Sequence, residues 1–450
     1  MLSTNLTMLD KMHIWHPAQQ MKDGEVFPPI IIDHAKDCYL YDNEGKEYID
    51  IISSWWCNLL GHCHPEINAA IKKQLDTLEH VIFSNFSHEP AIRLCQALLP
   101  LLPEGLTRFQ FCDNGSSAVE CALKMAFQYQ LQIGQTHRTK YMCLNSAYHG
   151  ETIGALSVGA MDLYARLYKP LLMENIRIDG LDCYRCPYHK TRTTCQCECF
   201  EYAEQAFALH GQDTVALIVE PLLQGAAGMR MYPPAYLTKL KELCAAYGVL
   251  LIDDEIAAGF GRTGTMFAIE QAHVSPDILC TSKGLTGGYL PMALTITSEE
   301  IYQSFYADYN KHKAFMHSHT YAGNPLACTT AVEVLKILNR DQVIKNSREK
   351  ALYLHTCLKN RLKDHPNIGE IRHINMINAI ELVQDKKTKK AFDSTRRIGW
   401  HIFRNAMKDG LVLRPIGDVL YFNPPLIISK ETLRIAVEKC ATAIESILPY

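Results

Sequence analysis

The sequence predicts an α/β fold, with a large domain on a mainly parallel sheet (residues 66–334) and a smaller α+β domain built from both ends of the chain. Short apolar runs alternate with helix-like segments through the middle of the chain, which is typical of such a sheet flanked by helices. The chain has 450 residues, which is too long for one simple core. The pattern changes near both ends, which indicates a second folding unit.

The strand-like runs of the large domain are RFQFC (108–112), TVALIVE (214–220), VLLIDDE (249–255), DILCTSK (277–283) and MALTITS (292–298). After the first run, a helical pattern places Val119, Ala122, Ala126 and Tyr129 on one face. The segment PPAYLTKLKELCAAYG predicts a helix that begins with proline and ends at Gly248.

The smaller domain is predicted from residues 1–65 and 335–450. From about residue 335, KILNRDQVIKNSREKALYLHTCLKNRLKDH predicts a long helical stretch. LVLRP and VLYFNPP, farther along, predict short strands. No internal repeat or low-complexity linker is visible between the two domains.

Composition excludes several classes of protein. With 48% hydrophobic and 21% charged residues, the chain is neither disordered nor fibrous. A net charge of -3 gives no basic field for nucleic acid or for an anionic membrane. The N-terminal residues lack the apolar core of a signal peptide, and no run approaches the roughly 20 apolar residues that span a bilayer. We expect a cytoplasmic protein that acts on small molecules.

One cluster stands out among the seventeen cysteines. The segment CYRCPYHKTRTTCQCEC contains His189 and five cysteines: Cys183, Cys186, Cys195, Cys197 and Cys199. Cys-x-x-Cys is metal-ligand spacing, but the second half is Cys-x-Cys-x-Cys rather than a second such pair. We predict a surface excursion of reduced thiols and no metal site, with structural zinc as the alternative.

Three features of the large domain fit one ligand. In DNGSSAVE, a turn at Gly115 brings Ser116 and Ser117 to a helix start, where free amides suit a phosphate. LIDDE ends a strand with carboxylates, and Lys283 in CTSKGLTGG follows another strand. Alone, each feature also fits a helix cap, a solvated loop or a surface lysine. Together they match pyridoxal phosphate: the cradle anchors its phosphate, Lys283 forms the Schiff base and Asp254 keeps its pyridine nitrogen protonated.

The ordered motifs DNGSSAVECALKMA, AYHGET, EPLLQGAAGM, LIDDEIAAGFGRTG, CTSKGLTGG and HTYAGNPLA resemble the class III aminotransferases, which have the type I pyridoxal-phosphate fold. The resemblance covers nearly the whole chain. It implies that Lys283 is also the proton shuttle, and that Gly115 and Ser116 hold the phosphate. It places Tyr148 on the cofactor ring, with His149 beside it.

The resemblance also implies a homodimer. Thr320 matches a threonine that in this family reaches the phosphate of the neighbouring subunit, so the active sites would be shared. Glu220 and Arg262 match a pair that helps related enzymes to sort substrates.

Both ends of the chain resemble one branch of the class, the aminotransferases that convert 8-amino-7-oxononanoate to 7,8-diaminononanoate in biotin synthesis. The matching segments are DKMHIWHPAQQM, SSWWCNLLGHCHPEINAAI and LVLRPIGDVLYFNPP. Trp55 and Trp56 would form an apolar wall for the aliphatic keto acid, and Arg414 would bind its carboxylate. Alternatively, the tryptophans are core residues and Arg414 is a surface charge. Gly115, Tyr148 and Lys283 would complete this substrate site, where donor and acceptor react in turn by a ping-pong mechanism.

Two positions depart from that branch, and both bear on the amino donor. Ala18 replaces a tyrosine after WHP, and Glu151 replaces an aspartate after YHG. S-adenosylmethionine is the expected donor, with lysine as the alternative. A general ω-amino acid:pyruvate aminotransferase or an aminomutase would share every cofactor residue. A nucleotide-binding protein is the remaining alternative, although no G-x-G-x-x-G or G-x-x-x-x-G-K-[ST] loop follows a strand.

Overall fold

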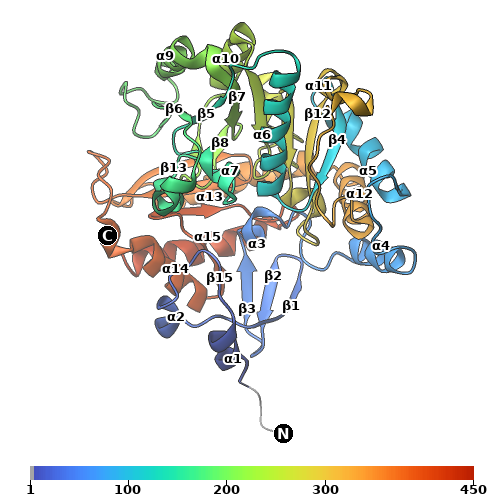
Figure 1. Cartoon of the computed structure of the whole chain (residues 1–450). Coiled ribbons are helices and arrows are strands. Elements are labelled where there is room, and N and C mark those ends of the chain that lie inside the picture. The colour runs from blue at the N-terminus through green and yellow to red at the C-terminus, as the bar shows by residue number, and fades with distance from the viewer. Residues whose placement is uncertain (1–4) are drawn as a thin grey trace.

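The computed structural model describes residues 5–450, and a seven-stranded sheet forms its centre (Figure 1). The strands are β4 (Leu106–Cys112), β5 (Lys140–Leu144), β6 (Ile176–Ile178), β7 (Thr214–Val219), β10 (Leu250–Asp254), β11 (Ile278–Thr281) and β12 (Ala293–Ser298). Their order is β4-β12-β11-β10-β7-β5-β6. β12 is antiparallel to both neighbours, and the other pairs are parallel. The prediction of a mainly parallel sheet is confirmed.

The central strands form because their residues are apolar on both faces. All six residues of β7 and all four of β11 are buried. A strand that is covered on both faces has a continuous apolar run rather than an alternating one. Each of the five predicted runs overlaps one of these strands.

Helices cover the two faces of the sheet. The predicted face of α6 (Gly115–Gln132) is buried, and its most exposed member, Tyr129, is only 8% exposed. The buried apolar residues of α6 belong to one apolar cluster, and those of α10 (Pro234–Tyr247) belong to another. α10 ends at Gly248, whose φ of 66° is left-handed and therefore suits glycine.

The two ends of the chain share a second sheet. Its strands, in spatial order, are β1 (Ile32–Lys36), β2 (Tyr39–Asp42), β3 (Glu47–Asp50) and β15 (Leu411–Val412). β3 and β15 are parallel, with Ile49 opposite Leu411. A further antiparallel sheet contains β13 (Ile368–Ile374), β14 (Ile377–Leu382) and β16 (Val419–Phe422). Figure 1 shows the blue N-terminal strands beside the red C-terminal segments.

The long helical stretch predicted from about residue 335 is two helices, α12 (Pro325–Arg340) and α13 (Val343–Leu362). Gln342 has a φ of 51°, which interrupts the right-handed helix. α12 packs on α4 (Pro65–Leu75) and α5 (Glu89–Leu98), whereas α13 packs on α15 (Lys430–Glu445). The two helices have different partners, so the chain changes direction between them.

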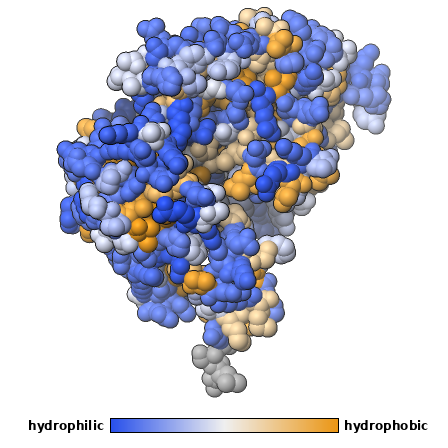
Figure 2. All heavy atoms as spheres, turned by 90° about the vertical axis from the view of Figure 1, so that its left-hand side faces the viewer, coloured by the Kyte–Doolittle hydropathy of each residue, from blue (hydrophilic) through white to orange (hydrophobic). Residues whose placement is uncertain are grey.

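The remaining helices are α1 (Leu6–His13), α2 (Asp23–Val26), α3 (Ser53–Trp56), α7 (Ile153–Ser157), α8 (Asp162–Ala165), α9 (Glu201–His210), α11 (Glu299–Phe305) and α14 (Ile398–Lys408). A small ribbon pairs β8 (Leu223–Gln224) with β9 (Arg230–Met231). The face drawn in Figure 2 is mainly hydrophilic, with hydrophobic patches near its centre. In residues 5–450, no helix is long and apolar enough to cross a membrane.

Candidate active site

The residues expected to hold the cofactor lie at one edge of the central sheet. β4, β5, β7, β10 and β11 are parallel to one another, so their carboxyl ends meet at that edge. Ligands of open α/β sheets bind at this position. Gly115 and Ser116 follow β4, and Lys283 follows β11. The fold therefore brings the predicted phosphate cradle and the predicted Schiff-base lysine to the same edge.

Lys283 leaves β11 in an unusual backbone conformation. Its φ is 43°, which is uncommon for a residue with a side chain. Its Nζ lies 4.6 Å from the centroid of the Trp56 ring. Burial lowers the pKa of Lys283, and the nearby carboxylates of Asp254 and Glu220 partly oppose this shift. A lowered pKa favours the neutral amine, which is the nucleophilic form.

Asp254 is the last residue of β10 and is 4% exposed. Its Oδ2 lies 2.7 Å from His149 Nδ1, and its Oδ1 accepts the Ile256 N–H at 3.1 Å. His149 is buried, and its Nε2 has no partner within residues 5–450. A buried carboxylate fixed by an imidazole suits a protonated ring nitrogen, and an unpartnered buried nitrogen fits a polar ligand group.

The start of α6 can hold a phosphate, but one predicted donor is already used. Asn114 is the N-cap, and its Oδ1 accepts the Ser117 N–H at 3.1 Å. In the described part of the chain, the amides of Gly115 and Ser116 stay free of such a cap bond. A Cβ on Gly150 would lie 2.1 Å from Ser116 Oγ, so only glycine lets this loop approach the cradle. Ser117 lies at the helix start as expected, but its amide is the one that the Asn114 side chain already caps.

Tyr148 is fixed beside this edge by two carboxyl groups. Its N–H donates to Glu220 Oε2 at 3.0 Å, and its hydroxyl donates to Glu151 Oε1 at 2.9 Å. Glu220 is 5% exposed, and its Oε1 accepts the Gly225 N–H at 2.9 Å. Burial raises the pKa of Glu220 to about 7. Burial also raises the pKa of the Tyr148 hydroxyl, which therefore stays protonated.

Arg262 is 1% exposed, and its guanidinium bonds backbone carbonyl oxygens from two separate segments of the chain. It donates to the carbonyl oxygens of Asn58 at 2.9 Å and of Pro424 at 2.6 Å, with longer bonds to those of Trp56 and Asn423. No Arg262–Glu220 ion pair occurs within residues 5–450. The two residues expected to sort substrates therefore have different hydrogen-bond partners.

The two tryptophans of the expected substrate wall have different environments. Trp56 is 6% exposed, and its Nε1 donates to the Tyr421 hydroxyl at 3.0 Å. Trp55 is 43% exposed, and the Arg414 guanidinium lies 4.4 Å from its ring centroid. Arg414 Nη2 also donates to the Ala18 carbonyl at 3.0 Å. The structure thus places a cation, Arg414, on an exposed aromatic face.

The backbone that positions these tryptophans has a strained conformation. Ser54 and Trp55 have φ values of 44° and 75°. Buried Asp50 holds the turn, because its carboxylate accepts the Ser54 N–H at 3.0 Å and the Ser54 hydroxyl at 2.7 Å. Strain of this kind concentrates at functional sites. The sequence interpretation missed Asp50, and the only signal for Tyr421 was its place in the strand-like VLYFNPP.

Two further sets of predicted residues are Thr320 and the cysteines of residues 183–199. Thr320 is exposed, in the segment before α12. The five cysteines of residues 183–199 do not include three thiols within 4.8 Å of one another in the described chain.

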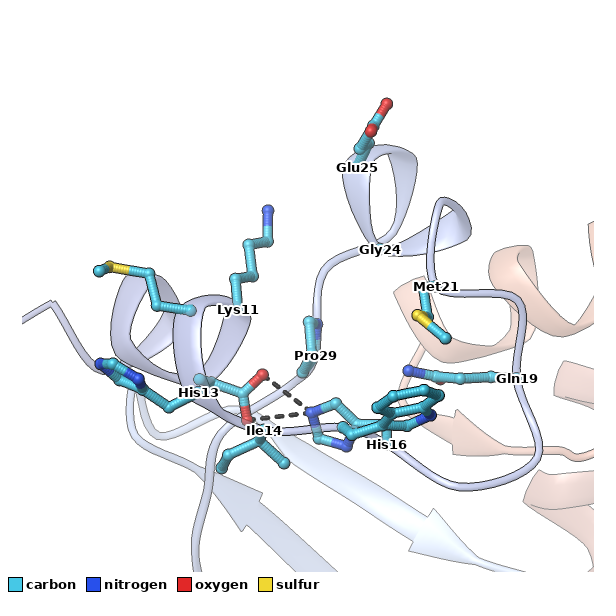
Figure 3. Close-up of a pocket in the computed structure, with 12 residues that line it drawn as sticks. Lys11, His13, Ile14, His16, Gln19, Met21, Gly24, Glu25 and Pro29 are labelled. Carbon is cyan, nitrogen blue, oxygen red and sulfur yellow. Dashed lines mark hydrogen bonds and ion pairs between the residues drawn. The ribbon is translucent and has the colours of Figure 1, made fainter.

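One surface hollow, of about 420 Å³, is lined by residues between Asp10 and Pro29 (Figure 3). His16 Nε2 bonds both Asp10 oxygens there, at 2.9 and 3.0 Å.

Comparison with known proteins identifies the family. The model of aminotransferase class III matches residues 20–444. Two adenosylmethionine-8-amino-7-oxononanoate aminotransferases are similar over nearly the whole chain. That of Nitratidesulfovibrio vulgaris is 42% identical and covers 100% of this chain and 83% of its own. That of Helicobacter pylori is 40% identical and covers 96% of both chains.

Solved structures agree in fold. The adenosylmethionine-8-amino-7-oxononanoate aminotransferase of Methanocaldococcus jannaschii has a TM-score of 0.92 and 36% identity, covering 98% of this chain and 99% of that one. An ω-transaminase of Pseudomonas jessenii in complex with PMP has a TM-score of 0.93 and 28% identity, covering 99% and 98%. These matches leave no place for the alternative of a nucleotide-binding protein without pyridoxal phosphate. The chain belongs to the class III aminotransferases, which are pyridoxal-phosphate-dependent transaminases of fold type I.

Proposed function

We propose that the protein transfers an amino group to 8-amino-7-oxononanoate and forms 7,8-diaminononanoate, a step of biotin biosynthesis. The observation that carries the proposal is the stacking of Arg414 on Trp55, with Trp56 next to Lys283. This arrangement offers an apolar path that begins at a reactive amine and ends at a cation. A long aliphatic chain with a terminal carboxylate matches it. The named full-length relatives support the same substrate.

Bound pyridoxal phosphate supplies an electron sink and carries the amino group between the two halves of a ping-pong cycle. Lys283 would serve as the nucleophile toward this group and would then move a proton, roles that its lowered pKa favours. Asp254 would keep a proton on the ring nitrogen, and His149 fixes the Asp254 carboxylate. Gly115 and Ser116 would hold the phosphate through their free amides, and Tyr148 would lie against the ring.

The amino donor we propose is S-adenosylmethionine, and lysine remains the alternative. Both molecules are cationic, and exposed Glu151 places a carboxylate beside the Tyr148 hydroxyl. The Ala18 side chain leaves more space than a tyrosine would at this position. A panel of S-adenosylmethionine, lysine and alanine with 8-amino-7-oxononanoate as acceptor tests the proposal. Failure of the purified enzyme to use 8-amino-7-oxononanoate with any donor would refute it.

We also propose a cytoplasmic homodimer with shared active sites. Exposed Thr320 would reach the phosphate bound by the other subunit. Large apolar side chains are exposed nearby and in the N-terminal segment, with Trp15 80%, Met316 85% and Tyr321 63% exposed. Figure 3 shows Met21 and Ile14 around the N-terminal hollow. An apolar surface of this kind fits contact with a second copy. Sedimentation of the holoenzyme tests the oligomeric state.

The division into domains remains a proposal. We assign residues 66–334 to the large cofactor-binding domain, and residues 1–65 with 335–450 to the small one. The pairing of β3 with β15 supports one unit made from both ends. Limited proteolysis that released residues 1–65 from 335–450 would contradict this division.

A general ω-aminotransferase is the second candidate, because ω-transaminases are among the similar structures. It shares the cofactor residues and differs at the substrate wall. Activity on simple ω-amino acids with pyruvate, and none on 8-amino-7-oxononanoate, would favour it. An aminomutase would instead isomerise a single substrate in the same panel.

A further inference from the structure

Three side chains from distant segments meet beside the phosphate cradle. Cys112 ends β4, Cys121 lies in α6, and His319 precedes Thr320. One donor atom from each lies within 4.8 Å of the other two. Within residues 5–450, no other group of three or more His, Cys, Asp and Glu side chains is so close. We call these three residues the cysteine-histidine cluster.

The two thiols of the cluster form only a weak hydrogen bond with each other. Their Sγ atoms are 3.3 Å apart, and the residues are 2% and 0% exposed. This S–H···S contact, with burial, raises the pKa of Cys121. Thiols are weak donors and weak acceptors, so the contact satisfies little of their capacity. A soft cation would use both sulfurs as thiolates.

His319 offers a nitrogen of defined tautomer to the cluster. Lys124 Nζ can only donate, so its 3.0 Å bond to His317 Nδ1 leaves the proton of neutral His317 on Nε2. His317 Nε2 then donates to His319 Nε2 at 3.0 Å. The proton of neutral His319 therefore lies on Nδ1, which is 3.5 Å from Asp113 Oδ2. A carboxylate behind one imidazole nitrogen and a lone pair on the other is the usual arrangement of a metal-binding histidine.

The size of the cluster fits a tetrahedral ion. Zinc binds thiolate at about 2.3 Å and imidazole at about 2.0–2.1 Å, so its neighbouring ligand atoms are about 3.5–3.8 Å apart. The thiols would separate by only a few tenths of an ångström, and the ion would take the place of the His317 N–H. Within the single chain the His319 side chain is 22% exposed, whereas both sulfurs are buried.

We propose that Cys112, Cys121 and His319 bind one zinc-class ion per chain, with water as the fourth ligand. The ion would join the end of β4, helix α6 and the segment that carries Thr320, all beside the phosphate cradle. Binding should raise the melting temperature of the holoenzyme and slow its loss of cofactor on dilution. The proposal does not depend on the substrate, so it can fail while the proposed function holds.

Cobalt titration of the reduced, metal-free holoenzyme tests the site, because cobalt ligand-field bands lie away from the absorbance of the cofactor. We expect one tightly bound equivalent in the wild type. Cys112→Ser and Cys121→Ser should each abolish the bands, and Asp113→Asn should weaken binding by about 10–100-fold. Cys186→Ser is the matched control for the thiols of residues 183–199 and should bind as the wild type does.

A second measurement avoids variants that could misfold. Zinc X-ray absorption on the wild type should show two sulfur ligands and two nitrogen or oxygen ligands. A shell of four sulfurs, or cobalt bands that survive in Cys112→Ser and vanish in Cys186→Ser, would overturn the proposal. So would a protein that binds no metal, including one that only forms a Cys112–Cys121 disulfide on oxidation.

Discussion

The cofactor edge of the sheet differs in structure from the expected substrate region around Trp55, Arg414 and Glu151, which we call the mouth. At the edge, Asp254, His149 and Glu220 are at most 5% exposed, and the Asp254–His149 contact is 2.7 Å. At the mouth, Trp55 is 43% exposed and Glu151 is exposed. Buried polar contacts act in a low dielectric and keep one geometry, whereas exposed contacts are screened and adaptable. The edge therefore suits a fixed cofactor, and the mouth suits two unlike substrates in turn.

The origin of the residues separates the two regions further. The edge uses residues at the ends of adjacent strands, so the fold itself brings them together. The mouth combines a strained turn at Trp55 with Arg414 and the Ala18 carbonyl, from opposite ends of the chain. Members of one family can thus keep the edge and change the mouth. Substitution of a proposed edge residue should therefore reduce the activity of the enzyme far more than substitution of a mouth residue.

The largest effect is expected for Lys283→Ala. It removes the proposed nucleophile and proton shuttle together, so turnover should fall by at least about 10⁴-fold. The absorbance of cofactor linked to lysine should vanish, while circular dichroism stays unchanged. Lys72→Ala, an exposed lysine on α4, is the control and should be fully active. An active Lys283→Ala enzyme would end the proposed mechanism.

Asp254→Asn should come next. It keeps the shape of the side chain but removes the charge that contacts His149 and that we propose faces the ring nitrogen. Loss of one preorganised electrostatic contact costs about 10²–10³-fold in kcat. The cofactor should still copurify, because its phosphate site is separate. Near-normal kcat with full cofactor content would remove Asp254 from this role.

The raised pKa of buried Glu220 should make the free energy of unfolding of the cofactor-free protein depend on pH. Burial raises the pKa of Glu220 from 4.5 to about 7, so the folded state binds more protons than the unfolded state between these pH values. Glu220 therefore favours folding below about pH 4.5 and loses that contribution as pH rises through about 7. This loss is on the order of 3 kcal/mol. Denaturant unfolding of Glu220→Gln should show a shallower fall in stability across this range. An unchanged slope would contradict the raised pKa.

At the mouth, Arg414→Ala should weaken the binding of only one of the two substrates. Losing a charge-assisted contact costs about 1.5–3 kcal/mol, which is roughly 10–100-fold in affinity. The KM for 8-amino-7-oxononanoate should rise by that factor, while the half-reaction with the amino donor changes less. Arg93→Ala, an exposed arginine on α5, is the control. Equal losses in both half-reactions would mean that Arg414 supports the Ala18 segment rather than the acceptor.

The same contrast explains what the sequence could predict. Buried apolar runs correctly predict the sheet, and the residues at their ends make Lys283 and Asp254 the site candidates, because these signals are local. The break at Gln342 depends on which helices α12 and α13 contact. The cap bond that uses the Ser117 amide and the carbonyls that hold Arg262 are set by backbone geometry. The cysteine-histidine cluster joins residues about two hundred positions apart, and no local spacing marks it.

The smallest effect is expected at Glu151, where charge and hydrogen bonding can be separated. Its Oε1 accepts the Tyr148 hydroxyl at 2.9 Å from an exposed position. Glu151→Gln keeps an acceptor for Tyr148 but removes the charge proposed to attract a cationic donor. The KM for S-adenosylmethionine should rise by about 3–10-fold, since an exposed charge contributes about 1 kcal/mol, and the KM for 8-amino-7-oxononanoate should not change. Glu151→Ala also frees the Tyr148 ring and should impair both half-reactions. If Gln and Ala act alike on both substrates, Glu151 works only through Tyr148, and the donor is selected elsewhere at the mouth.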